Sequence, residues 1–141
     1  MPIGLVCSPV RGRHDHGVVT ADREAVIRLV VRGPGGREAR TTAVVDTGFN
    51  GWLSLPRSLI ERLRLPWRER ESALLADGNE SLFDIHEGRA IWDRGLRRIP
   101  IHAADATPLV GMSLLAGYEL KVQVRVGGKV TIKSLPRRKS G

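Results

Sequence analysis

The stretch Ala43-Val44-Val45-Asp46-Thr47-Gly48-Phe49-Asn50-Gly51 places an acid, a hydroxyl and a glycine directly after an apolar run. Apolar residues before a turn signal are typical of a buried β-strand, so a strand would deliver Asp46, Thr47 and Gly48 at its end. The triplet alone is weak evidence, since it is expected by chance in about one chain in forty of this length. The alternative is an ordinary strand-to-turn transition in which the aspartate bonds its own backbone. The neighbouring segments must therefore decide its meaning.

Extended runs surround the triplet on both sides. Upstream, residues 26–32 alternate, the glycine-rich residues 33–36 break the chain, and residues 40–46 resume a β-rich run, which predicts a hairpin. Downstream, residues 53–55 predict a short strand. Pro56 can begin a short helix that runs through Leu65.

The second half of the chain predicts two further hairpins. Ala76-Asp77-Gly78-Asn79 is a turn by composition, between Leu74-Leu75 and an extended run over 82–91. Residues 93–95 reverse the chain into an extended run over 98–103. Residues 109–115 run into a short helix that Gly117 can cap. A closing hairpin follows, with valines and a leucine at period two over 120–126, Gly127-Gly128, and then Val130 and Ile132. Many short strands with few helices predict an all-β, barrel-like fold.

Length and composition predict one folded domain. A chain of 141 residues suits a single domain, and 41% hydrophobic residues are too many for a fully disordered chain. No apolar stretch approaches the roughly 18 residues of a membrane helix, and the first ten residues lack the basic start of a signal peptide. A single cysteine, Cys7, cannot form an internal disulfide, so we expect a cytoplasmic protein. We expect a flexible leader at 1–17, the domain at 18–135 and a basic tail at 136–141.

Neither the charge pattern nor the possible metal ligands predict a nucleic-acid partner or a metal site. The net charge of +8 is mostly scattered among acidic and apolar residues, and the bare basic run is Arg137-Arg138-Lys139. Nucleic acid is therefore an unlikely partner, and a basic nucleic-acid-binding β-domain is a distant alternative whose binding would depend on salt. The cluster His14-Asp15-His16 lacks a distant further ligand, which favours a polar tail over a metal site. No metal, cofactor or membrane is expected. His86 and His102 could be imagined with Cys7 as a thiol-protease pair, but surface or core positions are favoured.

Taken together, four elements resemble the retropepsin-like aspartic proteases over residues 18–135. They are Val44 to Gly51, the hairpin that contains Leu75-Ala76-Asp77-Gly78, the segment Leu109-Val110-Gly111-Met112-Ser113-Leu114-Leu115, and the terminal hairpin. Asp-Thr-Gly-Phe-x-Gly and Gly-Met-x-Leu-Leu are similar to stretches of the bacterial single-domain subgroup. The resemblance implies a closed β-barrel with one or two short helices that acts as a homodimer.

The resemblance also implies roles for individual residues. Asp46, Thr47 and Gly48 would be catalytic, with one aspartate supplied by each subunit because the chain has one such triplet. Thr47 would tie the two active-site loops together, and Gly48 would present backbone to the carboxylate and substrate. Phe49 would contact substrate, and Leu109, Val110 and Gly111 would support the active-site loop. The hairpin tip would be a flap that closes over the peptide; Asp77 within it is expected to form the turn rather than act as an acid. The flap residues are Ala76, Asp77, Gly78 and Asn79.

These roles predict an aspartic endopeptidase that cleaves peptides or proteins. Two carboxylates about 3 Å apart share one proton, so one can activate water while the other polarises the peptide carbonyl. The alternative is a catalytically weak peptide-binding or scaffold dimer of the same fold.

Overall fold

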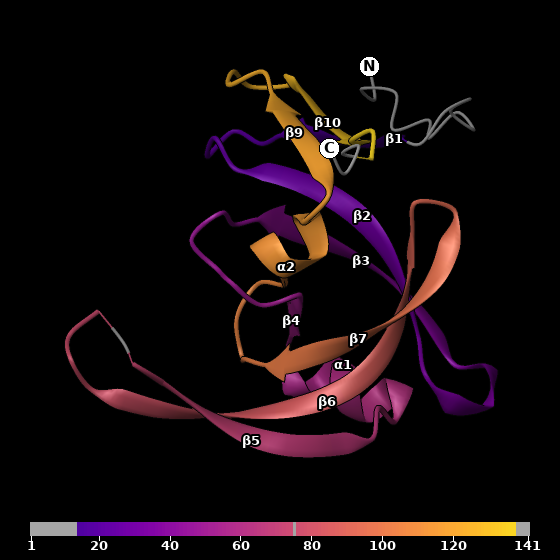
Figure 1. Cartoon of the computed structure of the whole chain (residues 1–141), viewed down its shortest axis with the longest axis vertical. Coiled ribbons are helices and arrows are strands. Elements are labelled where there is room, and N and C mark those ends of the chain that lie inside the picture. The colour runs from indigo at the N-terminus through magenta and orange to yellow at the C-terminus, as the bar shows by residue number, and fades with distance from the viewer. Residues whose placement is uncertain (1–13, 75, 138–141) are drawn as a thin grey trace.

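Ten β-strands of the described residues form one sheet in the computed structural model, which describes residues 14–74 and 76–137 (Figure 1). Their order is β5-β6-β7-β4-β8-β3-β2-β1-β10-β9, and β6 also pairs with β2, so the sheet curls back on itself. Two short α-helices and one 3₁₀ turn complete the fold. The strands are β1 (His14–Val19), β2 (Ala25–Arg32), β3 (Glu38–Val45), β4 (Leu53–Leu55), β5 (Trp67–Leu74), β6 (Glu80–Trp92), β7 (Gly95–Ala103), β8 (Leu109–Val110), β9 (Tyr118–Val122) and β10 (Lys129–Ser134); the helices are α1 (Arg57–Leu63) and α2 (Met112–Leu115), with the 3₁₀ turn at Pro34–Gly36. The mostly-β prediction with one or two short helices is confirmed, whereas full closure into a barrel stays a prediction.

All three predicted hairpins are present and antiparallel: β2 with β3, β5 with β6, and β9 with β10. Several boundaries differ from the prediction by a few residues, and two of these differences have a clear structural cause. Helix α1 ends at Leu63 because Arg64 takes a left-handed conformation at φ 52°, which stops the helix before Leu65. Strand β9 ends at Val122, and Val124 and Val126 lie 69% and 67% exposed in a wide turn. Backbone bonds inside that turn, such as Gly128 N–H to Arg125 O at 2.7 Å, hold it away from the extended form.

The predicted leader over 1–17 is wrong for its last residues. Strand β1 begins at His14 and pairs with β10 on one side and with β2 on the other. Gly17 permits this close pairing, because a Cβ there would lie 1.9 Å from the carbonyl oxygen of Val26. The composition of the segment suggested a loop, but its glycine serves strand packing. Residues 1–13, which include Cys7, and residues 138–141 lie outside the described residues.

The apolar core and a cavity lie on opposite faces of β7. Ile99, Ile101 and Ala103 are almost fully buried in the apolar core. The alternate residues Pro100 and His102 line a cavity on the other face. The alternation of side chains along one strand therefore separates the packing that stabilises the fold from the surface available for chemistry.

A carboxylate network fixes the base of the β5–β6 hairpin. Asp84 of β6 accepts hydrogen bonds from the indole N–H of Trp67 at 3.1 Å, from Arg57 Nη1 at 3.2 Å and from Arg70 Nε at 3.1 Å. These donors come from β5 and from the start of α1, so one side chain joins three elements. The same donors, Trp67 first, lower the pKa of Asp84 to about 2.

We expect Asp84→Asn to lower the melting temperature at pH 7, because the amide loses the charge that the two arginines face. A carboxylate whose pKa is depressed on folding stabilises the fold above its unfolded pKa, and that contribution is lost as the pH falls toward the folded value. The difference in melting temperature between wild type and variant should therefore shrink between about pH 4 and pH 2. Calorimetric scans across this range test it, with Asp22→Asn in an exposed turn as the control. A difference that does not change with pH would show that the charge is irrelevant.

Candidate active site

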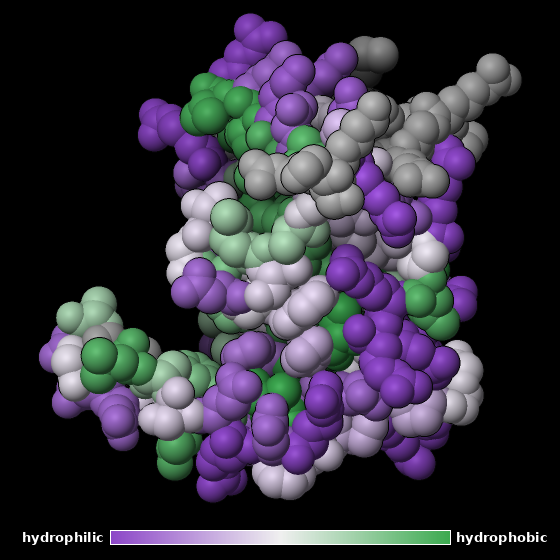
Figure 2. Space-filling view, in the orientation of Figure 1, coloured by the Kyte–Doolittle hydropathy of each residue, from purple (hydrophilic) through white to green (hydrophobic). Residues whose placement is uncertain are grey.

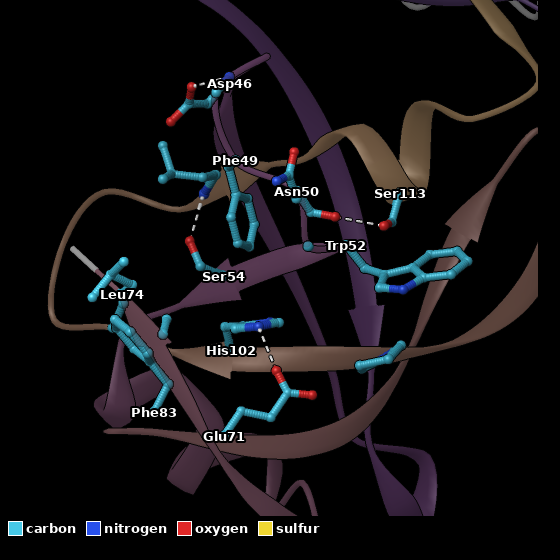
Figure 3. Close-up of a pocket in the computed structure, with 16 residues that line it drawn as sticks. Asp46, Phe49, Asn50, Trp52, Ser54, Glu71, Leu74, Phe83, His102 and Ser113 are labelled. Atoms are coloured by element: carbon cyan, nitrogen blue, oxygen red, sulfur yellow. Dashed lines mark hydrogen bonds and ion pairs between the residues drawn. The ribbon is translucent and has the colours of Figure 1, made fainter. Parts of the chain in front are cut away.

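Asp46 lies immediately after β3, where the backbone is held by a neighbouring strand. β8 runs parallel to β3, and the Asp46 N–H donates to the carbonyl oxygen of Val110 at 2.9 Å. Val110 is fully buried, so the anchor is rigid. The Asp46 carboxylate accepts the Gly48 N–H at 2.9 Å, and the Phe49 N–H donates to the Asp46 carbonyl at 3.1 Å. This tight turn leaves Asp46 at the wall of the cavity on the upper side of Figure 3.

The loop after Asp46 is bonded to the segment that begins α2. Gly111 N–H donates to Trp52 O at 3.0 Å, Met112 N–H to Phe49 O at 2.8 Å, and Ser113 N–H to Gly51 O at 3.1 Å. The Ser113 hydroxyl donates to Asn50 O at 2.5 Å (Figure 3). Each carbonyl oxygen of residues 49–52 therefore has a donor from residues 111–113.

The predicted support residues lie where this loop needs them. Leu109 and Val110 form β8, which is parallel to β3 and antiparallel to β4. The Leu109 N–H donates to the buried hydroxyl of Ser54 at 3.1 Å, which fixes β8 against β4. Gly111 packs so closely that a Cβ there would lie 2.2 Å from the carbonyl oxygen of Gly51. Only glycine fits at that point without displacing the loop.

The cavity beside Asp46 has a volume of about 690 Å³. Its walls come from the loop after β3, from β4 and β7, and from the inner part of the β5–β6 hairpin (Figure 3). Of the predicted site residues, Asp46, Gly48, Phe49 and Leu109 line it. Thr47 is exposed next to it, while Val110 and Gly111 are buried behind the loop.

The predicted flap tip does not line the cavity. Ala76, Asp77, Gly78 and Asn79 are exposed at the end of the hairpin, which Figure 2 shows as an arm standing away from the body. Asp77 accepts the Asn79 N–H at 2.9 Å and its side-chain amide at 3.1 Å, so the prediction that Asp77 forms the turn is confirmed. These two hydrogen bonds lower the pKa of Asp77 below its usual range. Residues nearer the base of the arm reach the cavity instead, namely Glu71, Ala73, Leu74 and Phe83.

Two ionisable residues of the cavity, Glu71 and His102, were not predicted as site residues from the sequence. His102 lies on β7, with Nε2 3.6 Å from Glu71 Oε2 and its ring edge-on to Phe49 at 5.3 Å between centroids. Burial lowers the pKa of His102 below 6.5, while Glu71 partly offsets the shift. The period-two pattern of β7, with apolar Ile99 and Ile101 on the other face, was the available signal. His86 lies elsewhere, with Nδ1 3.0 Å from the carbonyl oxygen of Leu65.

Within residues 14–74 and 76–137, no group of three or more histidine, cysteine, aspartate or glutamate side chains is arranged to hold a metal ion. In the same part of the chain, no helix has both the length and the apolar character to cross a membrane.

The described chain has a retropepsin-like fold. A solved structure of a retropepsin-like aspartic protease from Rickettsia conorii is similar over 84% of this chain and 88% of that one, with a TM-score of 0.55 and 13% sequence identity. The predicted resemblance is thus confirmed as a similarity of fold. No family model matches the sequence, and the curated proteins contain no match.

Proposed function

We propose that the chain is an aspartic endopeptidase in which two copies each contribute Asp46 to one active site. The observation that carries the proposal is the position of Asp46. It stands at the end of an anchored strand, beside a cavity of about 690 Å³, on a retropepsin-like fold. Because the sequence has one Asp-Thr-Gly, a dyad requires a second chain.

The proposed reaction needs the two Asp46 carboxyls to share one proton. The ionised carboxylate takes a proton from water as the water oxygen forms a bond to the peptide carbonyl carbon. The protonated carboxyl gives its proton to the carbonyl oxygen, which produces a neutral tetrahedral diol. The diol collapses as the C–N bond breaks and a proton moves to the amine nitrogen. No covalent enzyme intermediate forms.

The remaining predicted residues support this proposal through their positions. Gly48 already donates its N–H to the Asp46 carboxylate at 2.9 Å, which would orient that group toward substrate. Thr47 is exposed, so its hydroxyl is available to the active-site loop of a second subunit. The arm that ends in residues 76–79 would fold over a bound peptide and exclude water from the dyad.

Mixing of subunits tests the shared dyad. After full exchange of equal amounts of wild type and Asp46→Asn, about a quarter of the dimers contain two aspartates, and these alone should cut peptide. Activity per wild-type subunit should therefore fall to about half. The measurement is turnover of an unstructured peptide at fixed wild-type concentration with rising variant. Addition of Asp22→Asn subunits, which carry an exposed change outside the cavity, is the control for added protein.

Two outcomes would contradict the proposal in different ways. A flat titration after verified exchange would mean that each subunit works alone. Peptide binding by the wild type with no turnover would favour the peptide-binding dimer instead.

A further inference from the structure

The charges of the cavity are unbalanced. Asp46 and Glu71 are its carboxylates among the described lining residues, and no lysine or arginine lines it. Arg97 lies over the ring of Trp52 at 5.0 Å but is not part of the wall. His102 is the remaining titratable group of the wall, and its lowered pKa leaves it neutral at pH 7. A ligand therefore meets a second negative charge besides that of the proposed catalytic group.

Glu71 is placed to meet a ligand rather than bulk solvent alone. It lies on β5 opposite Phe83 of β6, and the aromatic ring lines the same cavity. Its side chain is 53% exposed, so its carboxylate remains hydrated while the cavity is empty. Figure 3 shows it on the lower side of the cavity, across from Asp46.

His102 is the cavity residue that lies next to this carboxylate, with Nε2 3.6 Å from Glu71 Oε2. An ionised carboxylate only accepts hydrogen bonds, so this proximity favours the tautomer of the neutral imidazole that carries its proton on Nε2. The other nitrogen, Nδ1, is buried without a hydrogen-bond partner among the described residues, and Phe49 holds the ring edge-on. Packing thus holds the imidazole with Nε2 toward one carboxylate oxygen of Glu71, and a shift of a few tenths of an ångström would let it donate to that oxygen.

We propose that Glu71, positioned by His102, is a specificity-determining residue that selects substrate peptides carrying an arginine or lysine side chain near the scissile bond. The inference rests on the proposed function and deepens it. Such a side chain would lay its apolar stem along Leu74 and Phe83, which line the same wall, and bring its cationic head to Glu71. A peptide with a neutral or acidic residue at that position leaves Glu71 without a cation, and an acidic residue is also repelled.

The test compares arginine with citrulline, its uncharged isostere, placed in turn at each position of an unstructured peptide. At one position, wild type should cleave the arginine peptide about tenfold more efficiently in kcat/KM. Glu71→Gln should reduce this ratio to about one through a loss of kcat/KM for the arginine peptide. Glu69→Gln is the matched control, since Glu69 lies two residues away on the same strand but does not line the cavity.

The role of His102 is tested by rescue. His102→Gln keeps an N–H at the place of Nε2 and should retain most of the arginine preference, whereas His102→Leu should lose it. Melting temperatures of both variants show whether packing against Phe49 is preserved. Equal preference in the two variants would remove His102 from substrate selection.

Binding measurements separate this proposal from the proposed peptidase activity. Fluorescence anisotropy of the same labelled peptides on Asp46→Asn protein, with and without Glu71→Gln, reports arginine preference without turnover. If wild type cleaves no peptide, the peptidase function fails, and the binding data still decide the role of Glu71. If no position distinguishes arginine from citrulline, or if Glu71→Gln keeps the ratio of wild type, the specificity proposal is wrong whatever the turnover.

Discussion

Asp46→Asn is expected to reduce peptide turnover at least about 10³-fold while leaving the fold and the dimer intact. The asparagine amide can neither take the proton of a water molecule nor share a proton with a second carboxyl. Its side-chain oxygen can still accept the Gly48 N–H, which Asp46 accepts at 2.9 Å, so the loop should hold its shape. The measurements are kcat/KM on an unstructured peptide, circular dichroism and sedimentation.

The matched control is Asp22→Asn in the turn between β1 and β2. The residue is exposed and lies outside the cavity, so turnover should stay close to that of wild type. Unchanged turnover in the Asp46 variant would remove this residue from the mechanism. Equal losses in both variants would point to a general loss of structure.

Gly111→Ala should produce the largest loss of stability of any single substitution considered for this loop. Its Cβ would lie 2.2 Å from Gly51 O and 2.6 Å from Phe49 Cδ2, so backbone as well as side chain must move. We expect a loss of about 3 kcal/mol or more in the free energy of unfolding, since overpacking against backbone cannot relax through a rotamer change. Turnover should fall in parallel, because the same loop carries Asp46.

Urea unfolding measures this effect, with Gly95→Ala as its control. A Cβ at Gly95 would meet Trp92 O at 3.8 Å, which is ordinary contact, and the cost should stay below about 1 kcal/mol. Similar midpoints for the two variants would mean that the 111–113 segment can shift without disturbing the Asp46 loop.

The sequence predicts those parts of the fold that depend on local pattern. The three hairpins follow from alternating residues on either side of glycine-rich or Asp-Gly turns, and the structure contains them. The placement of β8 between β3 and β4 joins segments about sixty residues apart, and nothing in local periodicity encodes such a parallel pairing. Local pattern predicted a short helix within residues 109–115, but only the resemblance to a known family indicated that the segment supports the Asp46 loop.

The candidate site also contains features that the local sequence predicts and features that depend on distant contacts. The position of Asp46 at the end of an apolar strand was predictable from residues 43–48. The turn that Asp77 forms was predictable from residues 76–79. The contact of His102 with Glu71 was not, because it depends on how β7 and the arm approach one another across the cavity. A histidine between the buried residues Ile101 and Ala103 could have indicated a second surface on the face of β7 opposite the core, but period two does not say what that surface contacts.

The position of β1 between β2 and β10 affects the order in which the strands can pair during folding. Within the hydrogen-bonded sheet, β10 and β9 join the remaining strands through β1, where Val18 pairs with Lys129. This pairing closes the chain between Val18 and Lys129, and the entropy cost of closing so long a loop comes before any stabilising contact forms. We therefore expect the pairing to form late and slowly during folding. During synthesis, the edge of β1 that pairs with β10 has no strand partner until β10 has left the ribosome. A chain arrested before Lys129 would therefore expose that edge to other chains, and we expect it to aggregate more readily than the full chain.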